Sequence, residues 1–184
     1  MSMYKKICIT NRHLVTGDYT EQIEKVLKTG VDVVILREKD LTETEYEELA
    51  VKVIDLCSRY GVVCMLHSFF GVALKLGHPY IHVTMEQARS LDMSDFIEVG
   101  VSTHSVDEAV EAVRLGATYI TASHIFETKC KEGLRPRGIR YLTEVTEAVS
   151  IPVYALGGII QSNVSDCIRA GAAGVCMMSE YMKM

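Results

Sequence analysis

The chain has 184 residues and a mass of 20.5 kDa, with 48% hydrophobic and 23% charged residues. This composition excludes disordered and fibrous proteins, and the length fits a single domain, 1–184, with no internal boundary. The formal net charge of −5, with no block of like charge, excludes the basic surface typical of nucleic-acid-binding proteins.

The sequence has no signal for a membrane span, a disulfide or a zinc site. No apolar run approaches the roughly 20 residues needed to span a bilayer, and the N-terminus has no long hydrophobic segment after its charges. The six cysteines form no C-x-x-C pair, so neither disulfides nor zinc are indicated. We therefore expect a cytoplasmic protein that binds neither membranes nor nucleic acid.

Short apolar runs alternate with longer amphipathic stretches along the whole chain. The apolar runs predict eight strands, at residues 7–10, 31–36, 62–66, 80–83, 96–101, 118–122, 151–155 and 174–177. The amphipathic stretches predict helices at 19–28, 43–60, 106–115, 140–149 and 162–170, with weaker helical patterns after the third and fourth strands. Because the strands are apolar on both faces, we expect parallel crossovers and a compact (β/α)8 TIM barrel.

The end of the chain is short for this fold. Such barrels typically need about 250 residues, and only 180–184 follow Ser179. We therefore expect a truncated final helix, and a second copy of the chain covering the outer surface there, as in a homodimer. An open doubly wound sheet is the alternative fold.

Polar residues follow most of the predicted strands, at the rim where TIM barrels place their active sites. Strand seven ends in Gly157 and Gly158, and strand eight in Ser179, where small residues let backbone N–H groups approach an anion. A phosphate site there is our prediction, and a simple turn is the alternative. A long polar loop, 124–138, follows the sixth predicted strand. It could fold over an anionic substrate or be a solvated surface loop.

This loop carries a resemblance to a known family. The pattern His-x-Phe-Glu-Thr over 124–128, with the segments 100–105 and 151–159, resembles the thiamine phosphate synthase superfamily, and within it the TenI-type thiazole tautomerases. The resemblance covers nearly the whole chain, since 35–41 and 175–179 also fall at the expected strands.

The synthase branch of the family implies a magnesium ion held by aspartates, and this sequence departs from that pattern. His67 and Ser68 stand where the family has Asn-Asp after strand three, and 84–87 replace its Gly-Gln-x-Asp. Ile35 replaces a glutamine, and Cys130 replaces a threonine. The remaining magnesium candidates are Asp40 and Asp92.

The tautomerase resemblance implies an isomerase that aromatises a carboxy-thiazolylidene ethyl phosphate by proton transfer, without metal or other cofactor. Synthases carry proline where this chain has His124, and an imidazole suits proton transfer near neutral pH. We therefore predict His124 as the catalytic residue. The predicted substrate-binding residues are Arg37, Lys39, Ser102, Thr128, Lys131, Gly157, Gly158, Met178 and Ser179.

Two alternative functions remain open. One is a thiamine phosphate synthase, or pyrophosphorylase, that joins a pyrimidine diphosphate to a thiazole phosphate. The other is a non-catalytic protein that binds a phosphorylated ligand. Among side chains near the rim, His67, His82 and His104 are interpreted as structural, and Cys130 as a less favoured nucleophile.

Overall fold

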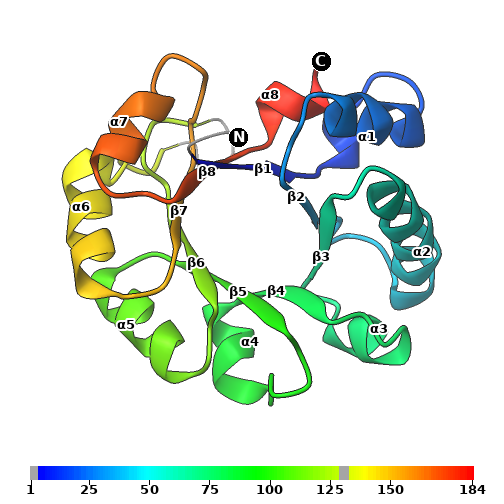
Figure 1. Cartoon of the computed structure of the whole chain (residues 1–184), viewed down its shortest axis with the longest axis horizontal. Coiled ribbons are helices and arrows are strands. Elements are labelled where there is room, and N and C mark those ends of the chain that lie inside the picture. Colours follow the sequence, from blue (N-terminus) through cyan, green and yellow to red (C-terminus); the bar gives the residue numbers. More distant parts are fainter. Residues whose placement is uncertain (1–3, 129–132) are drawn as a thin grey trace.

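The computed structural model describes residues 4–128 and 133–184, and eight parallel strands in it close into a barrel in chain order. The strands ring the centre of the molecule and the helices lie outside them (Figure 1). The strands are β1 (Lys5–Ile9), β2 (Val33–Leu36), β3 (Val63–His67), β4 (Tyr80–Thr84), β5 (Glu98–Thr103), β6 (Tyr119–Ser123), β7 (Val153–Leu156) and β8 (Gly174–Met177). The predicted TIM barrel is therefore confirmed, and the open sheet is excluded.

The helices follow the strands as the hydrophobic pattern predicts. They are α1 (Tyr19–Lys28), α2 (Glu43–Arg59), α3 (Phe70–Lys75), α4 (Met85–Ser90), α5 (Val106–Arg114), α6 (Gly138–Ala148), α7 (Val164–Arg169) and α8 (Ser179–Met182), with a 3₁₀ turn η1 (Arg12–Leu14) after β1. Helices α3 and α4 have six residues each, in the two places where the helical pattern is weak. Side-chain caps fix several starts: Thr42 and Thr84 each form a capping box.

The final helix is a single turn of four residues, as the short C-terminus predicts. It nevertheless packs against the outside of the barrel beside α1, because Tyr181 and Met182 are buried, and Gln22 of α1 donates a 2.6 Å hydrogen bond to the Tyr181 carbonyl. Where β8 pairs with β1, a Cβ on Gly174 would lie 2.2 Å from the Lys5 carbonyl oxygen, so the closing strand needs a glycine at this point.

Two apolar layers hold the fold together. The larger one lies between the strands and the helices that cover them, and a smaller one fills the barrel interior. The interior cluster is made of Ile7, Ile9, Ile35, Met65, Tyr119, Tyr154 and Cys176. This filling closes the inside of the barrel below the rim, so ligands can bind only above it.

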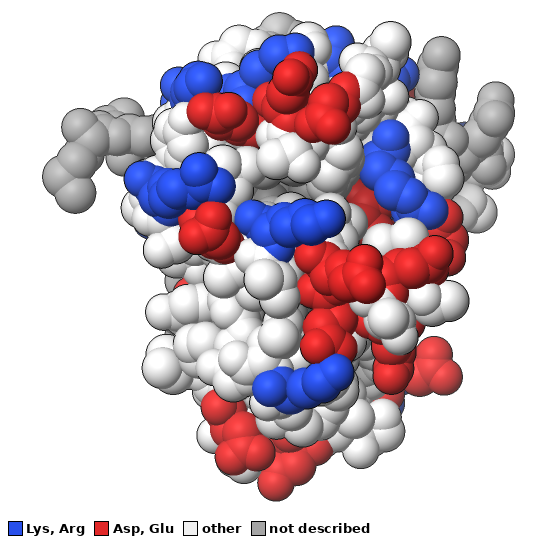
Figure 2. Space-filling model, turned by 90° about the vertical axis from the view of Figure 1, so that its right-hand side faces the viewer, with Lys and Arg blue, Asp and Glu red and all other residues white. Residues whose placement is uncertain are grey.

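The outer surface carries charges of both signs. On the side of the barrel where α2 and α3 lie, Lys and Arg are interspersed with Asp and Glu, and the acidic groups gather toward one edge (Figure 2). Among the described residues, no helix has both the length and the apolar character needed to cross a bilayer.

Candidate active site

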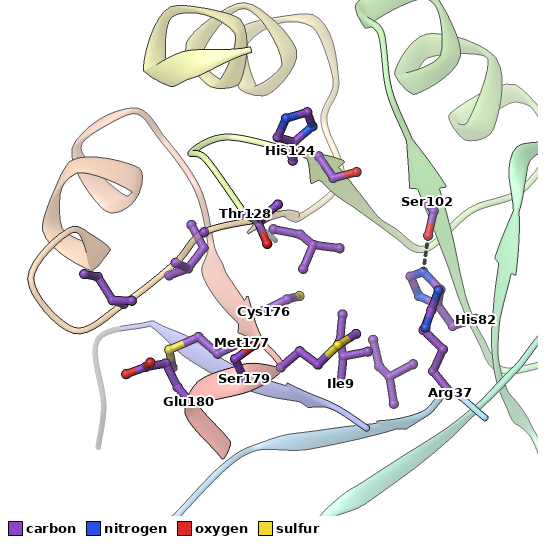
Figure 3. Close-up of a pocket in the computed structure, with 18 of the residues that line it drawn as sticks. Ile9, Arg37, His82, Ser102, His124, Thr128, Cys176, Met177, Ser179 and Glu180 are labelled. Carbon is purple, nitrogen blue, oxygen red and sulfur yellow. Dashed lines mark hydrogen bonds between the residues drawn. The ribbon is translucent and has the colours of Figure 1, made fainter. Parts of the chain in front are cut away.

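The carboxyl ends of the strands surround two cavities that share part of their lining (Figure 3 shows the first). The first cavity, of about 240 Å³, lies over β6, β7, β8 and β1. The second, of about 430 Å³, lies over β2 to β5. Five residues line both and form their junction: Arg37, His67, Ser102, Ser123 and Leu156.

Most of the predicted substrate-binding residues come together here. The first cavity is lined by Arg37, Ser102, Thr128, Gly157, Gly158, Met178 and Ser179, and Lys39 lines the second. Lys131 and Cys130 lie outside the described residues. The structure thus places eight of the nine predicted binding positions, from five strand ends, around two cavities with a shared lining.

The two glycines after β7 also have a packing role. Both have positive φ, +101° at Gly157 and +65° at Gly158. A Cβ on Gly157 would lie 2.3 Å from the His124 Cβ, and one on Gly158 would lie 2.3 Å from the Glu127 carbonyl oxygen. The missing side chains therefore let the loops after β6 and β7 touch, in addition to lining the cavity.

His124 lines the first cavity but is tied down. Its side chain is buried, and its Nε2 lies 3.3 Å from the carbonyl oxygen of Leu134, in the loop that returns toward α6. A proton on Nε2 would be donated to this backbone carbonyl oxygen. His124 thus forms part of the cavity wall and contacts the loop that leads to α6, and its catalytic role stays a prediction.

Two other histidines, interpreted from the sequence as structural, face the cavities. His67 and His82 stack with ring centroids 5.4 Å apart, and both line the first cavity. Burial, followed by the charges of Lys39 and Arg37, lowers the pKa of His82 to about 3. Burial also holds the pKa of His67 well below its ordinary value, so both rings are neutral at physiological pH.

A hydrogen-bonded row runs from the junction into the barrel. The Ser102 hydroxyl lies 2.9 Å from His82 Nε2, drawn as a dashed line in Figure 3, and His82 Nδ1 lies 2.8 Å from the Tyr119 hydroxyl. These residues could be found from their positions in the strands, because side chains alternate along β4 and β5 and this turns His82 and Ser102 toward the barrel interior. Sequence reasoning found Ser102 and missed His82 and Tyr119.

His67 is positioned from outside the barrel. The Tyr46 hydroxyl of α2 donates to the Leu36 carbonyl at 2.6 Å and accepts from the His67 backbone N–H at 2.9 Å. The Tyr46 ring is fully buried and stacks on Phe69 at 3.8 Å between centroids. This phenol bridges the ends of β2 and β3 and fixes the height of His67 at the cavity edge.

The basic groups of the rim fall into two classes. Arg12 is neutralised: its guanidinium reaches Glu38 at 3.3 Å and Asp40 at 2.5 Å. For Arg37, the structure shows no ion pair within the described ranges 4–128 and 133–184, and the same holds for Lys39. Burial and the neighbouring Arg37 lower the pKa of Lys39, as expected for two cations without a counter-ion.

The residues present do not fit an aspartate-held magnesium ion. Both Asp40 oxygens face Arg12, whose guanidinium holds the pKa of that carboxyl far below its usual range. Asp92 lies in the turn between α4 and β5, where it accepts from the Ser94 backbone N–H at 3.0 Å. Across the described parts of the chain, no three His, Cys, Asp or Glu side chains group as a metal site.

Comparison with known proteins identifies the family. The sequence model of the thiamine monophosphate synthase family matches residues 7–181. The thiamine-phosphate synthase of Shouchella clausii is 34% identical, with 99% of this chain and 90% of that protein covered. The synthase of Caldanaerobacter subterraneus is 35% identical over 91% of this chain and 81% of its own length.

A solved structure agrees. The thiamine phosphate pyrophosphorylase from Pyrococcus furiosus superposes with a TM-score of 0.87 at 26% identity, covering 99% of this chain and 89% of that one. The superfamily predicted from the loop pattern and its neighbouring segments is therefore confirmed.

The predicted activity is wrong. A thiazole tautomerase is an isomerase, whereas the named relatives and the solved neighbour are synthases or pyrophosphorylases, which are transferases. The tautomerase prediction depended on the residue type at position 124, and in the structure His124 Nε2 lies 3.3 Å from the Leu134 carbonyl oxygen. The match over 7–181, the full-length relatives and the shared barrel show that the chain belongs to the thiamine monophosphate synthase family.

Proposed function

We propose that this protein is a transferase that joins a pyrimidine diphosphate to a thiazole phosphate, as the names of its relatives suggest. The observation that carries the proposal is the pair of cavities that meet at Arg37, Ser102 and Leu156. A reaction between two molecules needs two adjoining spaces with a shared boundary, and proximity at that boundary speeds the reaction.

The thiazole phosphate is assigned to the first cavity. Apolar Ile9, Ile35 and Leu156 suit a flat heterocycle, and Thr128 and Ser179 offer hydroxyls for its phosphate. Gly157 and Gly158 add backbone without side chains to the lining of this cavity. In this proposal His124 bounds the ring without moving a proton.

The diphosphate is assigned to the second cavity and the junction. Arg37 and Lys39 carry positive charge there beside neutral imidazoles, so an anion would relieve their mutual repulsion. In the reaction a bond to the thiazole forms as the bond between the pyrimidine and its diphosphate breaks, and the electron pair leaves with pyrophosphate. The two cations would offset the charge that develops on this leaving group.

The test is a pyrophosphate-release assay. The protein is mixed with the pyrimidine diphosphate and the thiazole phosphate, separately and together, with added magnesium or with a chelator. We expect pyrophosphate, and the joined product by chromatography, only when both substrates are present. No product under any of these conditions contradicts the proposal.

Asp40, which is paired with Arg12, and the absence of a carboxylate cluster among residues 4–128 and 133–184 favour one second candidate, a protein that binds phosphorylated ligands without turnover. Calorimetric titration with each substrate separates the two. Saturable binding of the thiazole phosphate with no pyrophosphate release supports this second candidate, and release of pyrophosphate rules it out.

A further inference from the structure

Tyr119, His82 and Ser102 form a row of hydrogen bonds. Which group donates and which accepts in each bond follows from the donors and acceptors that each side chain has. All three side chains point into the barrel from β6, β4 and β5, and Ser102 stands at the junction of the two cavities. The distances are 2.8 Å from the Tyr119 hydroxyl to His82 Nδ1 and 2.9 Å from His82 Nε2 to the Ser102 hydroxyl.

The chain leaves room for this contact at one glycine. Gly100 pairs with His82 on one side and with Tyr119 on the other, so it lies between them in the barrel wall. A Cβ at Gly100 would stand 2.3 Å from His82 Nδ1 and 2.3 Å from the Tyr119 hydroxyl. The two side chains meet across a gap that only glycine leaves open.

The buried phenol fixes the first step of the row. Tyr119 is 2% exposed, and burial raises the pKa of its hydroxyl well above the ordinary value, so it keeps its proton. Among the described residues, His82 Nδ1 is the hydrogen-bond partner that the structure gives this hydroxyl. The phenol therefore donates to Nδ1, because the opposite direction would leave its O–H buried without an acceptor.

The second step follows from the charge on the ring. His82 is neutral, because burial and the nearby cations lower its pKa to about 3. With Nδ1 accepting from the phenol, the single ring proton must be on Nε2, which donates to the Ser102 oxygen. The Thr121 hydroxyl also donates to that oxygen, at 3.5 Å. The proton of Ser102 is then left to point into the junction.

We propose that Tyr119 is a positioning residue that fixes His82 as its Nε2–H tautomer and thereby makes Ser102 a hydrogen-bond donor toward the substrate. The junction consequently selects a substrate that places a lone pair there, such as an unprotonated ring nitrogen or a phosphate oxygen, and rejects one that places an N–H there. The effect on turnover depends on the proposed function, but the direction of the row does not.

The first experiment therefore needs no substrate. In protein labelled with ¹⁵N at histidine, protonated and unprotonated ring nitrogens of a neutral imidazole resonate in separate ranges, and His82→Asn assigns the signals. We expect His82 to show protonated Nε2 and unprotonated Nδ1. A protonated Nδ1 would overturn the proposal.

Substitution then tests the part played by Tyr119. Tyr119→Phe leaves Nδ1 unpartnered in either tautomer, so we expect averaged shifts at both nitrogens. Tyr154→Phe is the matched control, since it removes the hydroxyl of the ring whose centroid lies 5.2 Å from that of Tyr119, at a tilt of 57°, and leaves His82 untouched. Wild-type shifts in Tyr119→Phe would mean that another group fixes the tautomer, and would refute the role of Tyr119.

A double-mutant cycle tests the consequence for turnover. If Tyr119 acts through Ser102, Tyr119→Phe lowers kcat/KM roughly tenfold in the wild type and has no further effect in Ser102→Ala. Equal losses in both backgrounds would show a merely structural role. If no protein turns over, the proposed function fails, and the ¹⁵N shifts still decide the direction of the row.

Discussion

The two carboxylate oxygens of Glu38 lie 3.1 and 3.0 Å from the backbone nitrogen of Arg12, so the end of β2 holds the start of η1. The same carboxylate, 2% exposed, accepts from the hydroxyls of Thr10 at 2.7 Å and Tyr19 at 3.1 Å. This buried group organises the loop after β1 and pairs with Arg12, whereas Arg37 and Lys39 line the cavity without an ion pair within the described ranges.

The first prediction concerns this buried carboxylate. Glu38→Gln removes the charge and lets an amide N–H face other donors, so we expect a loss of about 1–3 kcal/mol in the free energy of unfolding. Urea denaturation measures it. Asp40→Asn, at the exposed end of the same ion-pair group, should change stability little; equal losses in the two variants would contradict this account.

The second prediction concerns Gly100. Gly100→Ala would place a methyl group 2.1 Å from the Tyr119 ring, and overpacking of this kind costs about 1–3 kcal/mol. Gly71→Ala is the control, because a Cβ in α3 meets nothing within 4 Å and alanine favours helix. Thermal unfolding should separate them, with a lower Tm for the first variant alone.

The third prediction concerns acid stability. His82 binds a proton near pH 6.5 when unfolded, but only near pH 3 in the native barrel. Between these values the unfolded state binds more protons, so stability falls as pH falls, by about 1.4 kcal/mol per pH unit for this residue. Above pH 6.5 neither state is protonated and the effect vanishes.

His82→Asn isolates that contribution. Its free energy of unfolding, measured in guanidinium between pH 7 and pH 4, should decline less steeply than that of the wild type by about this slope. Parallel declines would mean that the native ring takes up its proton at an ordinary pH.

The fourth prediction concerns the unneutralised cations. Arg37→Met should raise KM for the pyrimidine diphosphate roughly ten- to a hundredfold, the range for losing a charged hydrogen bond, with little change in Tm. Arg12→Met should lower Tm and leave KM nearly unchanged, because the Arg12 guanidinium is bound by Glu38 and Asp40. A stability loss in Arg37→Met with unchanged KM would assign Arg37 to the fold.

The fifth prediction concerns assembly and rests on the short helix α8. Helix α8 is a single turn, where other positions around the barrel carry helices of six to seventeen residues. We expect light scattering at low micromolar concentration to give twice the 20.5 kDa of one chain. A mass of one chain would remove the dimer.

The barrel could be predicted because its determinants are local. Each strand is an apolar run that its neighbours in sequence delimit, and helix ends are marked by glycines such as Gly30 and Gly116, both with positive φ in the structure. Loops at strand ends gather at one rim in any such barrel, which is why Arg37, Ser102 and Ser179 were found together.

The remaining features depend on contacts between distant residues. Gly100 leaves room for a hydrogen bond between side chains of β4 and β6. Its place between them follows from strand register, which no local sequence pattern encodes. That His124 bonds to Leu134 depends on how the loop returns to α6. The tautomerase prediction was based on the residue type at position 124, because the sequence does not reveal this contact.

The phenol of Tyr46 also makes the outer layer part of the site. Since it is bonded to both Leu36 and His67, any tilt of α2 is passed directly to the cavity edge. Substitutions on the outer surface of α2 can thus shift the cavity edge through Tyr46. Selection for altered substrate preference should therefore recover substitutions on that helix, remote from any atom the ligand touches.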